Sequence, residues 1–170
     1  MNRTSLMITA GMVIAACGTA GAQAQNMAKL GQKNDWAIYS YKDEKGKVCY
    51  TLTVPTDKQP PTLDHGKSMF FVVTPKPGDS TKFEPQFNAS YNLQENSKVE
   101  VTVDGKTFQM FTRGNRAWMD KTDEEPALIA AMRAGSDMKV AAKSGRGNPT
   151  SYVFSLKGIS AALKDVAACK

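Results

Sequence analysis

The chain consists largely of short runs in which apolar and polar residues alternate, and turn-forming residues separate these runs. The clearest alternation covers residues 98–105, where every second residue is a valine, as expected for a strand with one face turned inward. The Asp104-Gly105 pair at its end is a strong hairpin signal and leads directly into residues 106–112. Other strand-like runs cover residues 35–42, 47–54, 68–75, 87–93, 137–144 and 150–156. About eight short strands with turns between them indicate an all-β sandwich or barrel.

Two segments have helical spacing instead. Residues 122–135 begin with Thr122 and Glu125 at the spacing of a capping box, in which each side chain bonds the backbone N–H of the other residue. This segment ends at Gly135, a residue that commonly closes helices. Residues 159–169 carry a shorter amphipathic pattern. We therefore expect one or two short helices beside the strands.

The first residues have the pattern of an export signal. Arg3 precedes an uncharged apolar run at residues 5–16, and Ala22-Gln23-Ala24 supplies the small residues that signal peptidase recognises. The apolar run is too short for a permanent transmembrane helix, which needs about 20 apolar residues. We therefore expect residues 1–24 to be removed as a signal peptide.

A second processing route involves Cys17. The stretch Ile14-Ala15-Ala16-Cys17 resembles a bacterial lipobox, in which the cysteine becomes the lipidated first residue. Cleavage after Ala24 is preferred because a good conventional site lies just downstream, and lipidation at Cys17 remains the alternative. In both cases we expect a polar leader at residues 25–34 and one domain at residues 35–170, in the periplasm or associated with the outer membrane.

Processing leaves two cysteines in the folded part of the chain, Cys49 and Cys169, because Cys17 is either removed or acylated. Two cysteines in an exported chain favour one disulfide. Such a bridge closes a loop of about 120 residues, and the chain-entropy model assigns it about 5 kcal/mol as an upper value. The alternative is a pair of free buried thiols.

The chain is basic, with a formal net charge of +6. Removing residues 1–24 takes away only Arg3, which leaves 21 basic and 16 acidic residues and a net charge of +5. The basic residues are scattered, so we expect no nucleic-acid-binding arm. A solvated basic surface is the preferred interpretation, and a weak attraction to anionic membrane surfaces is the alternative.

The sequence offers little for catalysis or for metal and cofactor binding. Its single histidine, His65, lies in a polar loop next to Asp64, where a solvated surface residue is expected. One histidine and two bridged cysteines cannot complete a tetrahedral zinc site, and neither a calcium-loop motif nor a GxSxG turn occurs. The glycine-rich residues 144–147 lack the lysine of a phosphate-binding loop and are expected to form a turn. We therefore predict no catalytic residue, no cofactor and no metal site.

Most aromatic residues fall within strand-like runs, where a place in the core is expected. These residues are Trp36, Phe70, Phe71, Phe108, Phe111, Trp118 and Phe154. An aromatic residue that proved exposed would instead mark a binding face.

Taken in order, these segments resemble the invasion-associated locus B family of exported bacterial proteins. The resemblance rests on the signal peptide and on motifs spread over about residues 33–169: DWAIYSY, KVCYTLTV, HGKSMFFVVTPKPG, VEVTVDGKTFQMFT, AWMD, ALIAAMRAG, KVAAKSGRGNPTSYVFSLKGISAAL and the terminal Cys169. It implies an immunoglobulin-like β-sandwich with small helices, exported to the periplasm or associated with the outer membrane. The family has no established catalytic residues, so only Cys49 and Cys169 carry over, with a structural role.

Two functional hypotheses follow. The preferred one is a non-catalytic envelope protein that binds an envelope or host-surface macromolecule, with a role in host-cell invasion as one form of it. The alternative is a periplasmic small-ligand or glycan-binding protein or hydrolase, with His65 and Asp64 as nominal catalytic residues.

Overall fold

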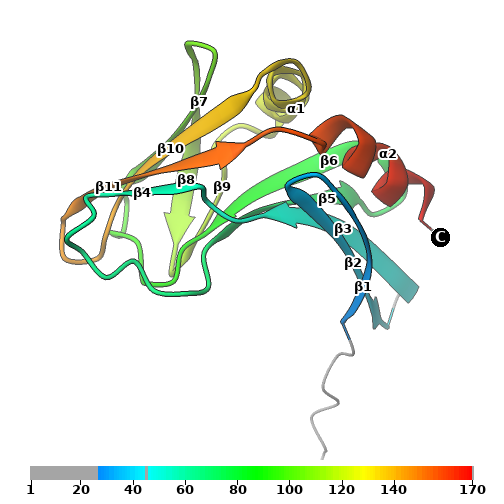
Figure 1. Cartoon of the computed structure of the whole chain (residues 1–170), viewed down its shortest axis with the longest axis horizontal. Helices are drawn as coiled ribbons and strands as arrows, with labels where there is room; N and C mark the ends of the chain where they lie inside the picture. Colours follow the sequence, from blue (N-terminus) through cyan, green and yellow to red (C-terminus); the bar gives the residue numbers. More distant parts are fainter. Residues whose placement is uncertain (1–26, 45, 170) are drawn as a thin grey trace, which may run out of the picture.

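The strands of the protein form one antiparallel sheet in the computed structural model, which describes residues 27–44 and 46–169 (Figure 1). Within these residues the strands are β1 (Ala28–Lys33), β2 (Trp36–Asp43), β3 (Gly46–Thr53), β4 (Asp57–Gln59), β5 (Phe70–Lys76), β6 (Asp79–Asn88), β7 (Lys98–Val103), β8 (Lys106–Arg113), β9 (Arg116–Met119), β10 (Asp137–Lys143) and β11 (Pro149–Ser155). Their order across the sheet is β1-β2-β3-β5-β6-β9-β8-β7-β10-β11-β4. The all-β fold class is therefore confirmed.

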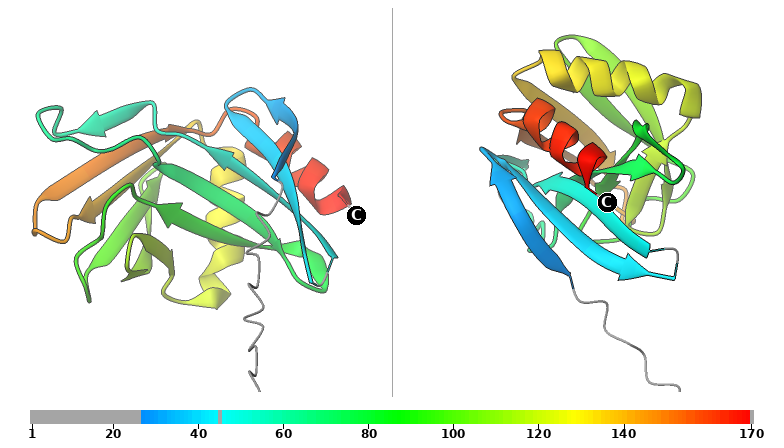
Figure 2. Two further views of the ribbon diagram at one scale, coloured as in Figure 1. Left: turned by 90° about the horizontal axis from the view of Figure 1, so that it is seen from below. Right: turned by 90° about the vertical axis from the view of Figure 1, so that its right-hand side faces the viewer.

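The sheet curls until its two halves face each other (Figure 2). Four strands separate β11 from β6 in the sheet order, yet Tyr152 of β11 packs on Phe87 of β6 with ring centroids 5.7 Å apart. Phe154 contacts the same Phe87 at 6.3 Å and Phe71 of β5 at 6.0 Å. The two layers expected of a sandwich are thus present as two halves of one continuous sheet, with the core between them.

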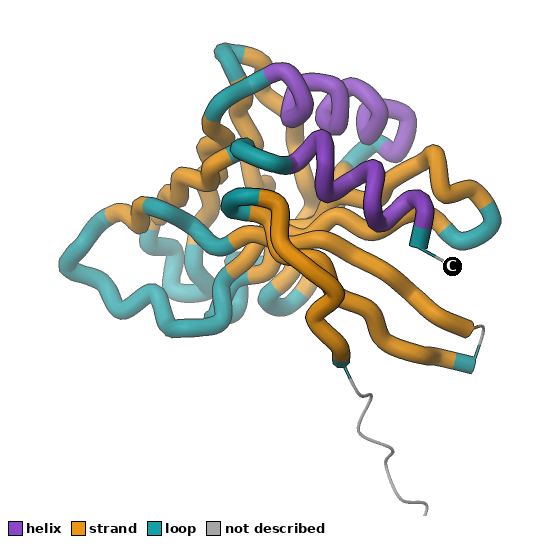
Figure 3. Tube along the Cα trace, turned by 45° about the vertical axis from the view of Figure 1, so that its right-hand side comes forward, coloured by secondary structure: helices purple, strands orange, loops and turns teal. Residues whose placement is uncertain are grey.

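Both helices lie on the inner side of this curl (Figure 3). Helix α1 (Glu125–Ala134) follows a short 3-10 turn, η1 (Thr122–Glu124), and helix α2 (Ile159–Ala168) packs against β2, β3 and β5. The buried residues of the helices belong to the same core as those of the strands: Leu128, Ile129, Met132, Ile159, Ala162, Leu163 and Val166. In the described part of the chain, neither helix is long and apolar enough to span a membrane.

The start of α1 differs from the predicted capping box. No side chain caps the helix, and Glu125 is 5% exposed and pairs instead with Lys76 of β5, Nζ to Oε2 2.5 Å. A carboxylate that is buried in this way needs a charged partner, and this contact supplies it. The helix ends at Gly135 as predicted, where the backbone becomes extended. The position needs a glycine because a Cβ there would lie 2.6 Å from Cγ1 of Val103.

The expected leader at residues 25–34 contains a strand. Residues 28–33 form β1, which pairs with β2 and forms one edge of the sheet. The strand expected at residues 87–93 lies earlier, because β6 begins right after a turn in which Gly78 has φ 81°. The signal peptide and Cys17 lie outside the described residues, so their processing stays a prediction.

The predicted disulfide is present and joins the second half of the fold to the first. Cys49 on the inner face of β3 is bonded to Cys169 at the end of α2, with Cα atoms 6.2 Å apart and 120 residues between them in sequence. The bridge therefore holds α2 against the inner face of the sheet.

Removing this bridge by substituting both cysteines with alanine should lower the free energy of unfolding by about 2–5 kcal/mol, because the unfolded chain regains the entropy of a long loop. Chemical denaturation of the oxidised protein measures this loss. Reduced wild-type protein is the matched control and should unfold at the same midpoint as the double variant. An oxidised wild type no more stable than the variant would contradict the assigned role.

Candidate functional site

His65 is not the solvated residue that the sequence predicted, because its side chain is 6% exposed and fully bonded. Its Nε2 lies 2.9 Å from the carbonyl oxygen of Pro60, and its Nδ1 lies 2.9 Å from the hydroxyl of Tyr152. The ring also meets that of Tyr152 edge to face, with centroids 5.3 Å apart. The polar loop at residues 60–66 thus turns its histidine inward, toward β11.

The contacts of His65 continue into a chain of hydroxyl groups. The Tyr152 hydroxyl lies 2.5 Å from that of Tyr91, which lies 2.9 Å from Oγ1 of Thr150. A carbonyl can only accept, so Nε2 of a neutral His65 donates to Pro60 and Nδ1 accepts from Tyr152. Tyr91 must then donate to Tyr152. The single hydroxyl proton of Thr150 has two acceptors within reach, the Tyr91 hydroxyl and the carbonyl of Ala142 at 3.3 Å. The direction is thus fixed from His65 to Tyr91, and every hydroxyl proton of the chain has an acceptor within the protein. Burial raises the pKa of the Tyr152 hydroxyl above its ordinary value of about 10.

The two nominal catalytic residues are neighbours in sequence but are not bonded to each other. Oδ1 of Asp64 accepts a hydrogen bond from the backbone N–H of Gly66 at 2.8 Å, and no hydrogen bond joins Asp64 to His65 among the described residues. Catalysis by His65 would require one of its two hydrogen bonds to break. In the described part of the chain, no three His, Cys, Asp or Glu side chains gather as a metal site would need.

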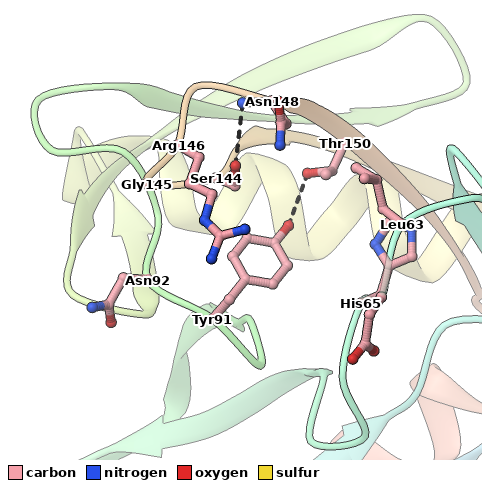
Figure 4. A pocket seen from close by; sticks show the side chains of 10 residues that line it. Leu63, His65, Tyr91, Asn92, Ser144, Gly145, Arg146, Asn148 and Thr150 are labelled. Atoms are coloured by element: carbon pink, nitrogen blue, oxygen red, sulfur yellow. Dashed lines mark hydrogen bonds between the residues drawn. The ribbon is translucent and has the colours of Figure 1, made fainter.

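A polar cavity of about 450 Å³ opens above this chain of hydroxyl groups (Figure 4). It is lined by Leu63, Asp64, His65, Tyr91, Asn92, Ser144, Gly145, Arg146, Asn148 and Thr150. Residues 144–147 form the predicted turn, in which the N–H of Gly147 donates to the carbonyl of Ser144 at 2.7 Å. The N–H of Gly145 donates to the carbonyl of Asn92 at 2.7 Å, which fixes this turn at the rim of the cavity.

A second feature lies on the outer face of the sheet, where one row of side chains crosses seven adjacent strands. The directly opposed residues, from β2 to β7, are Ala37, Leu52, Val72, Gln86, Trp118, Phe111 and Lys98. We call this the outer row. Phe111 is 40% exposed, and its ring stacks on that of Trp118 with centroids 5.7 Å apart. Because both helices pack on the inner face, neither covers the outer row.

Strand β3 shows that this face is unusually apolar. Its inner positions hold Cys49, Thr51 and Thr53, while Tyr50 and Leu52 point outward. Thr51 is accommodated inside because its hydroxyl donates to the carbonyl of Ala37 at 3.0 Å. Antiparallel sheets with one solvated face normally turn their polar residues outward, so the reversal on β3 calls for a reason outside the stability of the fold.

A tyrosine cluster adds to the apolar outer face at the β2–β3 hairpin. The ring of Tyr50 stacks on that of Tyr39 with centroids 5.7 Å apart and meets Tyr41 at 6.0 Å. Burial, together with the two neighbouring phenols, raises the pKa of Tyr50. The outer face therefore carries aromatic residues on both halves of the sheet.

Three of the aromatic residues that the sequence placed in the core lie on the outer face: Phe70, Phe111 and Trp118. The signal that could have separated them was the alternation itself. Phe108 and Met110 of β8 are buried, so Phe111, one residue further, must point the other way. The remaining four aromatic residues of that prediction are buried, as expected: Trp36, Phe71, Phe108 and Phe154.

Two arginines stand beside the aromatic pair. Arg113 and Arg116 are directly opposite each other in the β8–β9 hairpin, and both are exposed. No ion pair to either side chain is found within residues 27–44 and 46–169. Like charges directly opposite each other destabilise a sheet, so this pair also serves something other than folding.

The curled antiparallel sheet, the two inner helices and the disulfide define the class of protein as a disulfide-linked all-β domain. The family described as Invasion associated locus B (IalB) protein matches residues 36–167, and the chain belongs to this family. This confirms the resemblance drawn from the sequence motifs.

A solved structure supports the fold. The crystal structure of invasion associated protein B from Bartonella henselae matches with a TM-score of 0.56 and 20% sequence identity, covering 79% of this chain and 92% of that chain. No curated protein matches the sequence.

The hydroxyl chain can be tested by replacing Tyr152 with phenylalanine. This change should lower the free energy of unfolding by about 1–3 kcal/mol at neutral pH, because Nδ1 of buried His65 loses its donor. The wild type should also lose stability above about pH 10, where the unfolded chain releases a phenolic proton that folded Tyr152 retains. Above about pH 10 the free energy of unfolding of the variant should fall less steeply with pH than that of the wild type. Chemical denaturation over a pH series measures both effects.

Tyr39→Phe is the matched control, since Tyr39 is half-buried on the outer face. Its effect at neutral pH should stay within about 0.5 kcal/mol. Equal losses in the two variants, or an unchanged alkaline slope in Tyr152→Phe, would contradict the assigned bonding.

Proposed function

We propose that this protein is an exported, non-catalytic envelope protein that acts by binding another protein through the outer row. The main support for this proposal is the stacked pair of Phe111 and Trp118, which lies on a sheet face that neither helix covers. An exposed aromatic pair on a soluble domain is the kind of apolar surface that marks an interaction site.

The size and composition of the outer row favour a protein partner. From Leu52 to Phe111 the row crosses five strands, a span of about 19 Å at about 4.8 Å between strands. This extent is typical of the centre of a protein interface rather than of a small-molecule pocket. Tryptophan, tyrosine and arginine are also the residues that contribute most at such centres, and all three occur on this face.

The charges beside the row indicate the character of the partner surface. Arg113 and Arg116 project their guanidinium groups from the same hairpin that carries Phe111 and Trp118. Carboxylates of a partner would relieve the repulsion between the two arginines and bond them bidentately. We therefore expect an acidic rim around the apolar patch of the partner.

The location is part of the proposal. The export pattern of residues 1–24 and the Cys49–Cys169 disulfide both favour an oxidising compartment outside the cytoplasm. Membership of the family is consistent with export. We propose a place in the periplasm or at the outer membrane, with host-cell contact as one setting in which the binding would operate.

A photo-crosslinking residue at position 111, in cells of the producing bacterium, tests this proposal. It should give a discrete, protease-sensitive adduct, because that side chain would lie inside the interface. The matched control places the crosslinker at Val153, which is half-buried on the outward side of β11. The adduct should be absent from position 153 and should disappear in the Arg113→Glu, Arg116→Glu double variant.

Three outcomes would overturn the proposal. They are no adduct at position 111, the same adduct at position 153, or an adduct at position 111 that resists protease and so contains lipid or glycan.

A further inference from the structure

The polar cavity carries an arrangement of charge that neither the fold nor the outer row requires. Its lining includes one carboxylate, on Asp64, and one guanidinium, on Arg146. Asp64 comes from the loop before β5, and Arg146 comes from the turn between β10 and β11. The described residues contain no ion pair between the two, or from either one to a third residue.

The floor of the cavity has no free hydrogen-bond donor, because protein acceptors hold its hydroxyl and imidazole protons. His65, Tyr91 and Thr150 are bonded in the single chain that ends at the carbonyl of Pro60. A ligand must therefore find its hydrogen-bond donors and its charged partners at the rim, where Asp64, Arg146, Asn92 and Asn148 lie. Figure 4 shows Arg146 and Tyr91 among the side chains that line the cavity.

We propose that this cavity binds a zwitterion of the amino acid or short-peptide class. The ligand carboxylate would pair with Arg146 and the ligand ammonium with Asp64. A ligand with only a negative charge would face the Asp64 carboxylate, and one with only a positive charge would face Arg146. A ligand carrying both charges satisfies both groups.

The dimensions agree with this class. A cavity of about 450 Å³ lies in the range of about 300–1,000 Å³ that is usual for small-molecule sites. It accommodates a dipeptide and excludes a folded partner. The inference is independent of the proposed outer-row function, because the two surfaces share no residue.

Titration of the purified protein with alanyl-alanine, followed by calorimetry, tests this site. We expect saturable binding at one site per chain. The N-acetylated dipeptide and the C-terminal amide should each bind at least tenfold more weakly, because each has lost one of the two charges. A sugar acid such as glucuronate carries a carboxylate without an ammonium and should bind at least tenfold more weakly as well.

Substitutions of the two charged rim residues test whether the dipeptide binds in this cavity. Asp64→Asn keeps the oxygen that accepts from Gly66 and removes only the charge, and it should weaken dipeptide binding at least tenfold. Arg146→Ala should have an effect of the same size. Lys164→Ala removes a positive charge from the exposed side of α2 and is the matched control, with no change in binding expected.

The proposal is overturned if the dipeptide does not bind saturably, or if the blocked forms bind as tightly as the free form. Glucuronate binding that equals or exceeds dipeptide binding would also overturn it, in favour of an anion site. Loss of binding in Lys164→Ala equal to that in Arg146→Ala would exclude the cavity as the location.

Discussion

The packing of β11 against β5 and β6 is the interaction on which the rest of the structure depends. Phe154 and Tyr152 reach across the core to Phe71 and Phe87, and these contacts turn a flat ribbon of strands into two facing layers. Aromatic side chains bury large areas, so a few of them suffice to hold such a curl. Tyr152 also bonds His65, so the same residue that closes the sheet holds in place a residue that lines the polar cavity.

Because the sheet is curled, the side chains of each strand alternate between the packed core and the outer face of the sheet. The interior has both helices to cover it, and the disulfide holds α2 in place there. The exterior has no such cover from the helices, yet it carries the stacked Trp118 and Phe111, in register with Leu52 across Gln86 and the buried Val72. A fold selected for stability alone would place polar residues there, and we infer that binding accounts for the difference.

Much of the fold follows from local signals in the sequence. The Asp104-Gly105 turn was recognisable because both residues need positive φ, and they adopt 46° and 80°. The disulfide followed from counting cysteines. The environment of His65 could not be predicted, because its partner Tyr152 is 87 residues away in sequence. Glu125 was misassigned for the same reason, since a distant lysine rather than a local cap satisfies its carboxylate.

The choice of inner face on β3 lay beyond sequence patterns, because hydrophobicity favours the side that points outward. That reversal is the basis of the central claim, which is that the outer row is covered by a partner in the cell. Oxidative footprinting of Trp118 and Phe111, in purified protein and in intact envelopes, tests it most directly, with fully buried Trp36 as the internal reference. The account predicts that both outer residues are labelled in purified protein and protected in envelopes, while Trp36 is unlabelled in both. Equal labelling of Trp118 and Phe111 in the two samples would contradict it.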